Sequence, residues 1–213
     1  MKDFWDDDEV SHEDVARGTA NREKVLAELI DHALTSKPLD ADRVAKWHKD
    51  CLAGLSYVKG FEAWLGAYRG SDGDDELKEM RVGVDKTEGT LPHEVAHALD
   101  AFFTELRERM RALMSVIDAD KDKTREQLRR IAELAGWAHG EWVRIHPFAN
   151  ANGRTARLIA NWILVRFRLL PVVGIRPRPD HPYGPAAVAS MRGDHRKITN
   201  FILHLLENPP AGG

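Results

Sequence analysis

The chain has 213 residues, of which 43% are hydrophobic and 31% are charged, and its formal net charge is −3. This composition is typical of a soluble globular domain that buries a core, and the charge argues against nucleic acid bound over the whole surface. Cys51 is the single cysteine, which excludes an internal disulfide and a cysteine zinc cluster. No apolar run of about eighteen residues is present to span a membrane. We expect a cytoplasmic protein without membrane or nucleic-acid partners.

The N-terminal residues MKDFWDDDEV are strongly acidic, and we expect residues 1–18 to form an N-terminal arm. From about Thr19 apolar residues recur at helical spacing, which predicts a first helix that Pro38 closes. Asp40 is a candidate N-cap of a second helix that ends near Leu52. Residues 59–79 carry several glycines and an acidic run, so a solvated loop is the simplest prediction.

Residues 81–84 alternate in polarity and Glu88-Gly89 can turn the chain, which predicts a short hairpin before Pro92. Pro92 suits the first turn of the next helix, and a further helix reaches Ile145. The segment LIANWILVRF is apolar nearly all round, as in a helix buried among helices. After a proline-rich loop a last helix pair is expected at 186–191 and 197–206, with a disordered tail over residues 208–213. The fold predicted is a single, mostly α domain with one short β element.

The stretch HEVAH, from His93 to His97, matches the zinc-binding pattern HExxH, in which two imidazoles share one helix face and the glutamate acts as base. Pro92, however, places this stretch at the start of a helix, and no clear third-ligand motif follows. Glu94 in a first turn and histidines on a partly buried face explain the residues without a metal. A zinc metallopeptidase stays a remote alternative.

The stretch HPFANANGRTAR begins at His146 and makes a more connected case. Asn152 is a good N-cap and Gly153 lets a ligand approach the backbone, so the free N–H groups and the helix dipole form an anion site. Arg154 and Arg157 are one near-turn apart and can reach the same side. His146 can accept a proton beside that anion. Taken singly, each residue also fits a turn, a solvated charge or a partly buried histidine; their order together favours a polyphosphate site.

This stretch resembles the signature of the Fic family, HPFx(D/E)GNGRxxR. The matching positions are His146, Pro147, Phe148, Asn152, Gly153, Arg154 and Arg157. LDADRVAKWHKDCL, RVGVDKTEGTLPHEV and YGPAAVASMRGDHRKITNFILHLL also resemble elements of the family, so that residues 19–207 are covered. The resemblance implies an all-α Fic domain with a short β-hairpin, the flap, at about residues 81–92.

The resemblance implies transfer of AMP from ATP to a hydroxyl side chain, of Ser, Thr or Tyr, in a target protein. His146 would be the base that deprotonates this hydroxyl. Asn152 with the backbone N–H groups of Ala151 and Gly153 would form the anion hole for the α- and β-phosphates.

The resemblance assigns the more distal phosphates to Arg154 and Arg157, and it places the adenine near Tyr183. The flap would pair with extended backbone of the target as an added strand. Its target-docking residues are Asp85, Lys86, Thr87 and Glu88.

Two positions depart from the family pattern. Asn150 stands where the family has Asp or Glu, the carboxylate that holds Mg²⁺. Its amide oxygen is a neutral and therefore weaker candidate ligand, so we expect weakened Mg²⁺ dependence or an altered nucleotide preference. Ala151 replaces a glycine, which is tolerated if its φ stays negative.

Many family members carry an inhibitory helix with the motif (S/T)xxxE(G/N), whose glutamate pairs with the second arginine. The nearest match here runs from Thr19 through Glu23 but ends at Lys24. We expect Glu23 to be an ordinary charge of the first helix. Inhibition of the activity would then come from a separate antitoxin-like protein or from an atypical N-terminal arm, or there would be no inhibition.

Other functions within the fold stay open. One is transfer of a phosphate or of another nucleotide-derived group, and another is a nucleotide-binding regulatory protein without catalysis. The sequence leaves the target and the oligomeric state open.

Overall fold

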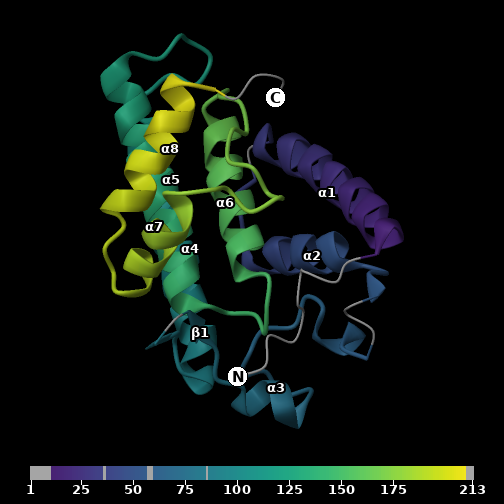
Figure 1. The fold of residues 1–213 in the computed structure, drawn as a ribbon. Helices are drawn as coiled ribbons and strands as arrows, with labels where there is room; N and C mark the ends of the chain where they lie inside the picture. Colours follow the sequence, from purple (N-terminus) through teal and green to yellow (C-terminus); the bar gives the residue numbers. More distant parts are fainter. Residues whose placement is uncertain (1–10, 36, 57–59, 85, 210–213) are drawn as a thin grey trace.

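The structure is a computed structural model, and it describes residues 11–35, 37–56, 60–84 and 86–209 (Figure 1). The α-helices are α1 His12–Ala33, α2 Ala41–Leu52, α3 Asp75–Glu79, α4 Val95–Met114, α5 Arg125–Ile145, α6 Asn152–Arg166, α7 Tyr183–Met191 and α8 Arg196–Glu207. Short 3-10 helices span Glu62–Trp64 and Pro92–Glu94, and strands β1 Gly83–Val84 and β2 Thr87–Glu88 form one antiparallel hairpin. The predicted, mostly helical fold with one short hairpin is confirmed. In the part of the chain described, every helix is too short or too polar to cross a membrane.

Helix ends follow local chemistry. Asp40 accepts a hydrogen bond from Arg43 N at 2.8 Å and caps α2 as predicted. Pro92 begins the 3-10 turn that leads into α4, also as predicted. Helix α1 begins at His12 rather than near Thr19, because Ser11 caps it and Asp14 is anchored by the Ser56 N–H at 2.7 Å. These contacts are polar, which is why apolar spacing did not reveal the first turns.

Helix α6 lies at the centre of the molecule, between α1 and α2 on one side and α4, α5, α7 and α8 on the other (Figure 1). Its residues from Thr155 to Val165 are all buried, as the apolar run predicted. Helix α8 packs closely on α5 because two glycines of α5 face it: a Cβ on Gly136 would lie 2.7 Å from Thr199 Cα, and one on Gly140 would lie 2.2 Å from His195 Nδ1. Larger residues at these positions would push α8 away.

Residues 60–79 are not a solvated loop, and that prediction was wrong. Trp64 and Leu77 are buried in a second hydrophobic cluster together with Met80 and Val82. The segment folds back on itself through short helices, so its apolar residues are too widely spaced to show a period. Arg69 also lies here and, at 1% exposure, is the most buried charge among the described residues.

The Arg69 guanidinium donates to backbone carbonyls from three parts of the chain. It reaches Met80 O at 2.8 Å and Thr90 O at 2.9 Å, on the two sides of the hairpin. It also reaches Ile145 O at 3.2 Å and His146 O at 2.8 Å, at the end of α5. Burial lowers the pKa of Arg69 to about 10, so the group stays charged at neutral pH. One side chain therefore fixes the base of the hairpin against the end of α5.

Helix α6 does not begin as predicted. Its N-cap is Ala151, which makes no side-chain cap, and Asn152 is already the first helical residue. The Asn152 amide is engaged elsewhere: Oδ1 accepts from Phe148 N at 2.9 Å and Nδ2 donates to Phe148 O at 2.8 Å. Ala151 has φ 58°, in the left-handed region, so the condition under which alanine is tolerated at this position, a negative φ, is not met.

Replacing Arg69 with methionine is expected to lower the free energy of unfolding by about 3 kcal/mol, because buried carbonyls lose their donors. Arg69→Lys keeps the charge but has a single donor group, so its free energy of unfolding is expected to lie between those of the parent and of Arg69→Met. Urea unfolding measures both, and Arg81→Met, which changes an exposed arginine, is the control with no expected loss. A variant as stable as the parent would contradict the assigned role.

Replacing Ala151 with glycine is expected to raise the free energy of unfolding by about 1 kcal/mol, since glycine adopts a positive φ without the Cβ clash. The same urea titration measures it. Ala156→Gly, the same substitution at a helical position of α6, is the matched comparison and is expected to lower the free energy of unfolding, because glycine is unfavourable inside a helix. A loss of stability in Ala151→Gly would show that the left-handed conformation carries no strain.

Candidate active site

His146 ends α5 with φ 53° and ψ 54°, a left-handed C-cap that turns its side chain off the helix axis. Its Nδ1 lies 3.0 Å from Val143 O. Because a carbonyl only accepts, Nδ1 carries the proton and Nε2 holds a lone pair. Burial lowers the pKa of His146 to about 4, so the ring is neutral at neutral pH. The predicted base is thus in the protonation state that accepts a proton.

The hairpin lies directly against this histidine. A Cβ on Gly89, just after β2, would lie 2.7 Å from His146 Cβ. Gly89 N donates to Val82 O at 2.9 Å, and Thr90 N donates to Ile145 O at 3.2 Å. Only glycine allows this approach, so Gly89 determines how near the flap comes to the base.

The loop between α5 and α6 is also held from α2. His48 of α2 accepts from Gly66 N at Nδ1, at 3.0 Å, and its Nε2 donates to Asn150 O at 3.2 Å. Its ring stacks on Phe148 with centroids 3.9 Å apart. Burial lowers the pKa of His48 to about 3, which keeps it neutral. Sequence reasoning missed both His48 and Arg69, because neither carries a motif and each lies far along the chain from the loop it holds.

Asn150 and Ala151, the two departures from the family pattern, contact each other. The Ala151 N–H donates to Asn150 Oδ1. The oxygen predicted as a weak Mg²⁺ ligand and the N–H predicted for the anion hole are therefore engaged with each other. Both roles require the Asn150 amide to turn away.

At the start of α6 a Cβ on Gly153 would lie 3.2 Å from Arg157 Nη1, so this position favours a residue without a side chain. Arg154 N and Thr155 N bond Ala151 O, whereas the N–H groups of Asn152 and Gly153 precede the first intrahelical acceptor. The predicted anion site therefore keeps two helix-start N–H groups with Arg157 beside them.

Arg157 is 4% exposed and is held by two contacts. Nη1 donates to Tyr183 Oη at 2.8 Å and Nη2 donates to Ile175 O at 2.6 Å. Tyr183 Oη lies 2.9 Å from His139 Nε2. Burial and the charge of Arg157 lower the pKa of His139 to about 3, so its neutral ring accepts the Tyr183 proton. Tyr183 thus positions Arg157, and its place near an adenine stays a prediction.

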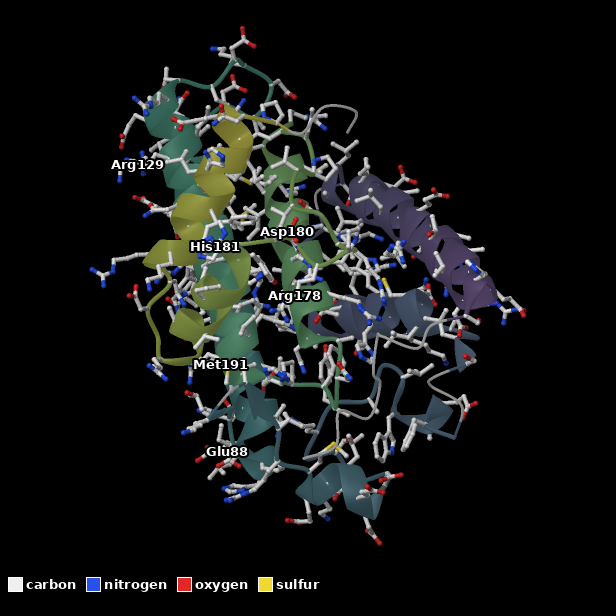
Figure 2. The ribbon with its side chains drawn as sticks, in the orientation of Figure 1. Glu88, Arg129, Arg178, Asp180, His181 and Met191 are labelled. Carbon is white, nitrogen blue, oxygen red and sulfur yellow. The ribbon has the colours of Figure 1, made fainter. Side chains whose placement is uncertain are left out.

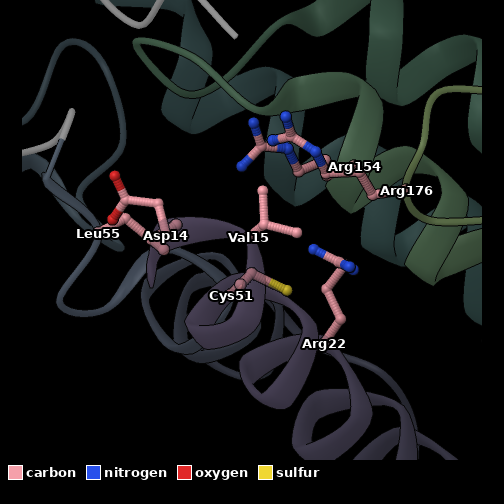
Figure 3. A pocket seen from close by; sticks show the side chains of 8 residues that line it. Asp14, Val15, Arg22, Cys51, Leu55, Arg154 and Arg176 are labelled. Atoms are coloured by element: carbon pink, nitrogen blue, oxygen red, sulfur yellow. The ribbon is translucent and has the colours of Figure 1, made fainter. Parts of the chain in front are cut away.

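Arg154 has different surroundings from Arg157. It lines a pocket between α1, α2 and α6 (Figure 3), whose other lining residues are Asp14, Val15, Gly18, Arg22, Cys51, Leu55 and Arg176. The two arginines predicted to reach the same side therefore lie on one helix turn but face different neighbours. Burial raises the pKa of Cys51 to about 12, so its thiol is protonated and unreactive.

The hairpin pairs Gly83 with Glu88 and Val84 with Thr87. Glu88, labelled at the lower left of the molecule in Figure 2, forms an ion pair with Arg81 at 3.3 Å. Lys86 is exposed at the turn, and Asp85 lies outside the described residues. The predicted docking residues that are described thus lie on a hairpin whose base contacts His146.

Neither the HEVAH stretch nor the nearest match to the inhibitory motif, which contains Glu23, is part of this site. His93 and His97 are exposed, and the described residues contain no group of three metal-ligand side chains. Glu23 is exposed and forms no ion pair within the described chain, and Arg157 bonds Tyr183 and Ile175 instead. The expectation that Glu23 is an ordinary helix charge agrees with this arrangement.

Comparison with known proteins places this geometry in a family. The model of the Fic/DOC family matches residues 38–164, more than half of the chain. The protein adenylyltransferase Fic of Nematostella vectensis is 40% identical over 75 residues, which is 35% of this chain and 17% of that protein. The protein of the same name in Culex quinquefasciatus is 34% identical over 95 residues, 45% of this chain and 19% of that protein. The chain thus spans less than a fifth of these curated relatives.

Solved structures share the fold. A Fic domain containing signaling protein from Bacteroides thetaiotaomicron superposes with a TM-score of 0.56 at 16% identity, covering 90% of this chain and 69% of that one. BepC of Bartonella tribocorum, solved with bound AMPPNP, gives 0.55 at 14% identity and covers 87% of this chain and 84% of that one. The matched family model includes the loop that carries His146 and most of α6, and the chain therefore belongs to the Fic/DOC family.

Proposed function

We propose that this protein transfers AMP from ATP to a hydroxyl side chain of a target protein. The observation that carries the proposal is that His146 is neutral and has a lone pair on Nε2. It lies in the loop that leads to the start of α6, where helix N–H groups can bind an anion. The adenylyltransferase relatives support it, as does the AMPPNP in the structure of BepC.

In the proposed reaction His146 Nε2 takes the proton of the target hydroxyl. The hydroxyl oxygen attacks the α-phosphorus of ATP, and pyrophosphate leaves. The N–H groups of Asn152 and Gly153 stabilise the charge that develops on the phosphate, with Arg154 and Arg157 at the leaving group. The protonated imidazole that results keeps its Nδ1 bond to Val143 O.

The residues present do not fit a strong Mg²⁺ site. The loop has no carboxylate, and Asn150 Oδ1 already accepts from Ala151 N. We therefore assign no step to a metal, and the positive charge at the phosphates comes from the arginines and the helix start.

The flap supports the selection of a protein target. Its strands are two residues each, and among the described residues no further strand pairs with them, so we propose that an edge of the hairpin accepts an added strand. Because Gly89 holds the hairpin base against His146, a target strand on this edge would bring its hydroxyl toward Nε2.

Replacing His146 with alanine is expected to reduce labelling at least about 100-fold, the usual contribution of a general base, while ATP still binds. The assay incubates the protein with labelled ATP and lysate and measures the intact mass of what is labelled. His97→Ala, at an exposed position, is the matched control and is expected to label as the parent does. Labelling by His146→Ala equal to that of the parent would refute the base assignment. An added mass other than that of AMP would show that a different group is transferred.

Replacing Asn150 with aspartate is expected to lower the Mg²⁺ concentration for half-maximal labelling at least about tenfold, because a carboxylate adds charge attraction for the cation. A MgCl₂ titration of labelling measures it. Asn200→Asp on α8 adds the same charge away from the site and is expected to change nothing. If both variants respond alike, position 150 does not hold the metal.

A further inference from the structure

A groove lies between the second half of α4, the connection from α1 to α2, and the C-terminal half of α6. Its volume is about 560 Å³, and buried apolar side chains from all three parts line it, among them Leu39, Leu106 and Trp162. At the far end of α6, Arg166 lies roughly 20 Å along the helix axis from Asn152. The groove is therefore separate from the candidate active site, and what it binds goes beyond the proposed function.

The charge of this groove is of one sign. Among the described residues that line it, none is acidic and four are basic: Lys37, Arg107, Arg111 and Arg166. The whole chain has a formal net charge of −3, so the groove is a local exception. Lys37, Arg107 and Arg111 are exposed and form no ion pair within the described part of the chain. These three cations are available to an acidic ligand.

The fourth cation, Arg166, holds the walls of the groove. Its Nη1 donates to Ala33 O at 2.9 Å and to Thr35 O, which connects α6 to the end of α1. Its Nη2 lies 3.7 Å from Met114 Sδ at the end of α4. Arg166 is therefore part of the frame, and the groove is shaped by contacts within the chain.

Helix α4 presents two parallel rows of side chains to the groove. Leu106, Met110 and Met114 form an apolar row in which residues are four apart, and Arg107 and Arg111 form a cationic row beside it. Residues four apart are neighbours on a helix surface, and like charges at this spacing disfavour the helix slightly, an effect that acidic side chains of a ligand would offset. Met114 is 37% exposed, and methionine adapts its shape to an apolar partner.

We propose that this groove binds an acidic amphipathic helix of a partner protein. The apolar face of that helix packs on the row that ends at Met114, and its Asp and Glu side chains pair with Lys37, Arg107 and Arg111. A helix laid along α4 presents apolar and acidic rows at the same spacing as the rows it meets. A small amphiphile with one carboxylate would leave most of the cations unpaired, and a nucleic acid would leave the apolar row uncovered.

The probe is a fluorescent synthetic peptide of about twenty residues, long enough to form a helix, with leucine on one face and glutamate on the other. Anisotropy against the full chain is expected to show saturable binding, which Arg107→Glu/Arg111→Glu weakens at least about tenfold. Arg107→Lys/Arg111→Lys keeps the charge and is expected to bind as the parent does. Arg125→Glu/Arg129→Glu, the same charge change at the same spacing on α5, is the matched control with no expected loss. Circular dichroism checks that every variant folds.

The same peptide with glutamine in place of glutamate is expected to bind at least about tenfold more weakly. A parent that does not bind the acidic peptide, or that binds it no better than Arg107→Glu/Arg111→Glu does, would overturn the inference. Binding of decanoate where the peptide does not bind would assign the groove to a small amphiphile instead. A dimer in sedimentation equilibrium that Arg107→Glu/Arg111→Glu abolishes would assign it to a second copy of this chain, which would also overturn the inference.

Discussion

The buried guanidinium of Arg69 is the contact on which the rest of the site depends. A charge in the interior is tolerated when its donors are matched, and here backbone carbonyls from the hairpin and the end of α5 supply the acceptors. The contact couples two elements that are distant in sequence and that the proposed chemistry needs together. In the proposed reaction the flap would position an incoming strand, and His146 would receive the proton of its hydroxyl. The Thr90 N–H adds a second bond between the same elements, to Ile145 O at 3.2 Å, so Arg69 and this bond together align the hairpin with the end of α5.

Desolvation sets the protonation state of the three histidines around the site. His48, His139 and His146 are all kept neutral by burial, yet they serve different ends. His48 uses both ring nitrogens in bonds to the chain, and His139 accepts from Tyr183. His146 uses only Nδ1. The same environment therefore yields two structural imidazoles and one candidate base. The nitrogen of His139 that has no bonding partner in the described residues, Nδ1, is buried, whereas Nε2 of His146 is not among the buried unpartnered atoms.

Sequence patterns located the helices and the motif well because both signals are local. Apolar spacing predicted the buried α6, and Asp40 and Pro92 marked helix starts. The braces of the site were missed because their partners are backbone atoms far along the chain: Arg69 bonds carbonyls of the hairpin and of α5, and His48 bonds Asn150. Asn152 was predicted to cap α6, as its residue type suggests, but tertiary contacts with Phe148 use its amide instead. Patterns thus predict which residues form a site better than they predict which atoms remain free in it.

The loop between α5 and α6 is bounded by two residues in the left-handed region, His146 and Ala151. Neither is glycine, so each conformation costs roughly 1–2 kcal/mol that packing must offset. The braces from Arg69, His48 and Asn152 hold the loop in this shape through hydrogen bonds within the chain. The entropy of ordering the loop is therefore lost when the protein folds and not when a nucleotide arrives. In the proposed reaction, nucleotide binding would therefore lose little further ordering entropy from this loop, and the affinity would depend mainly on the contacts with the phosphates.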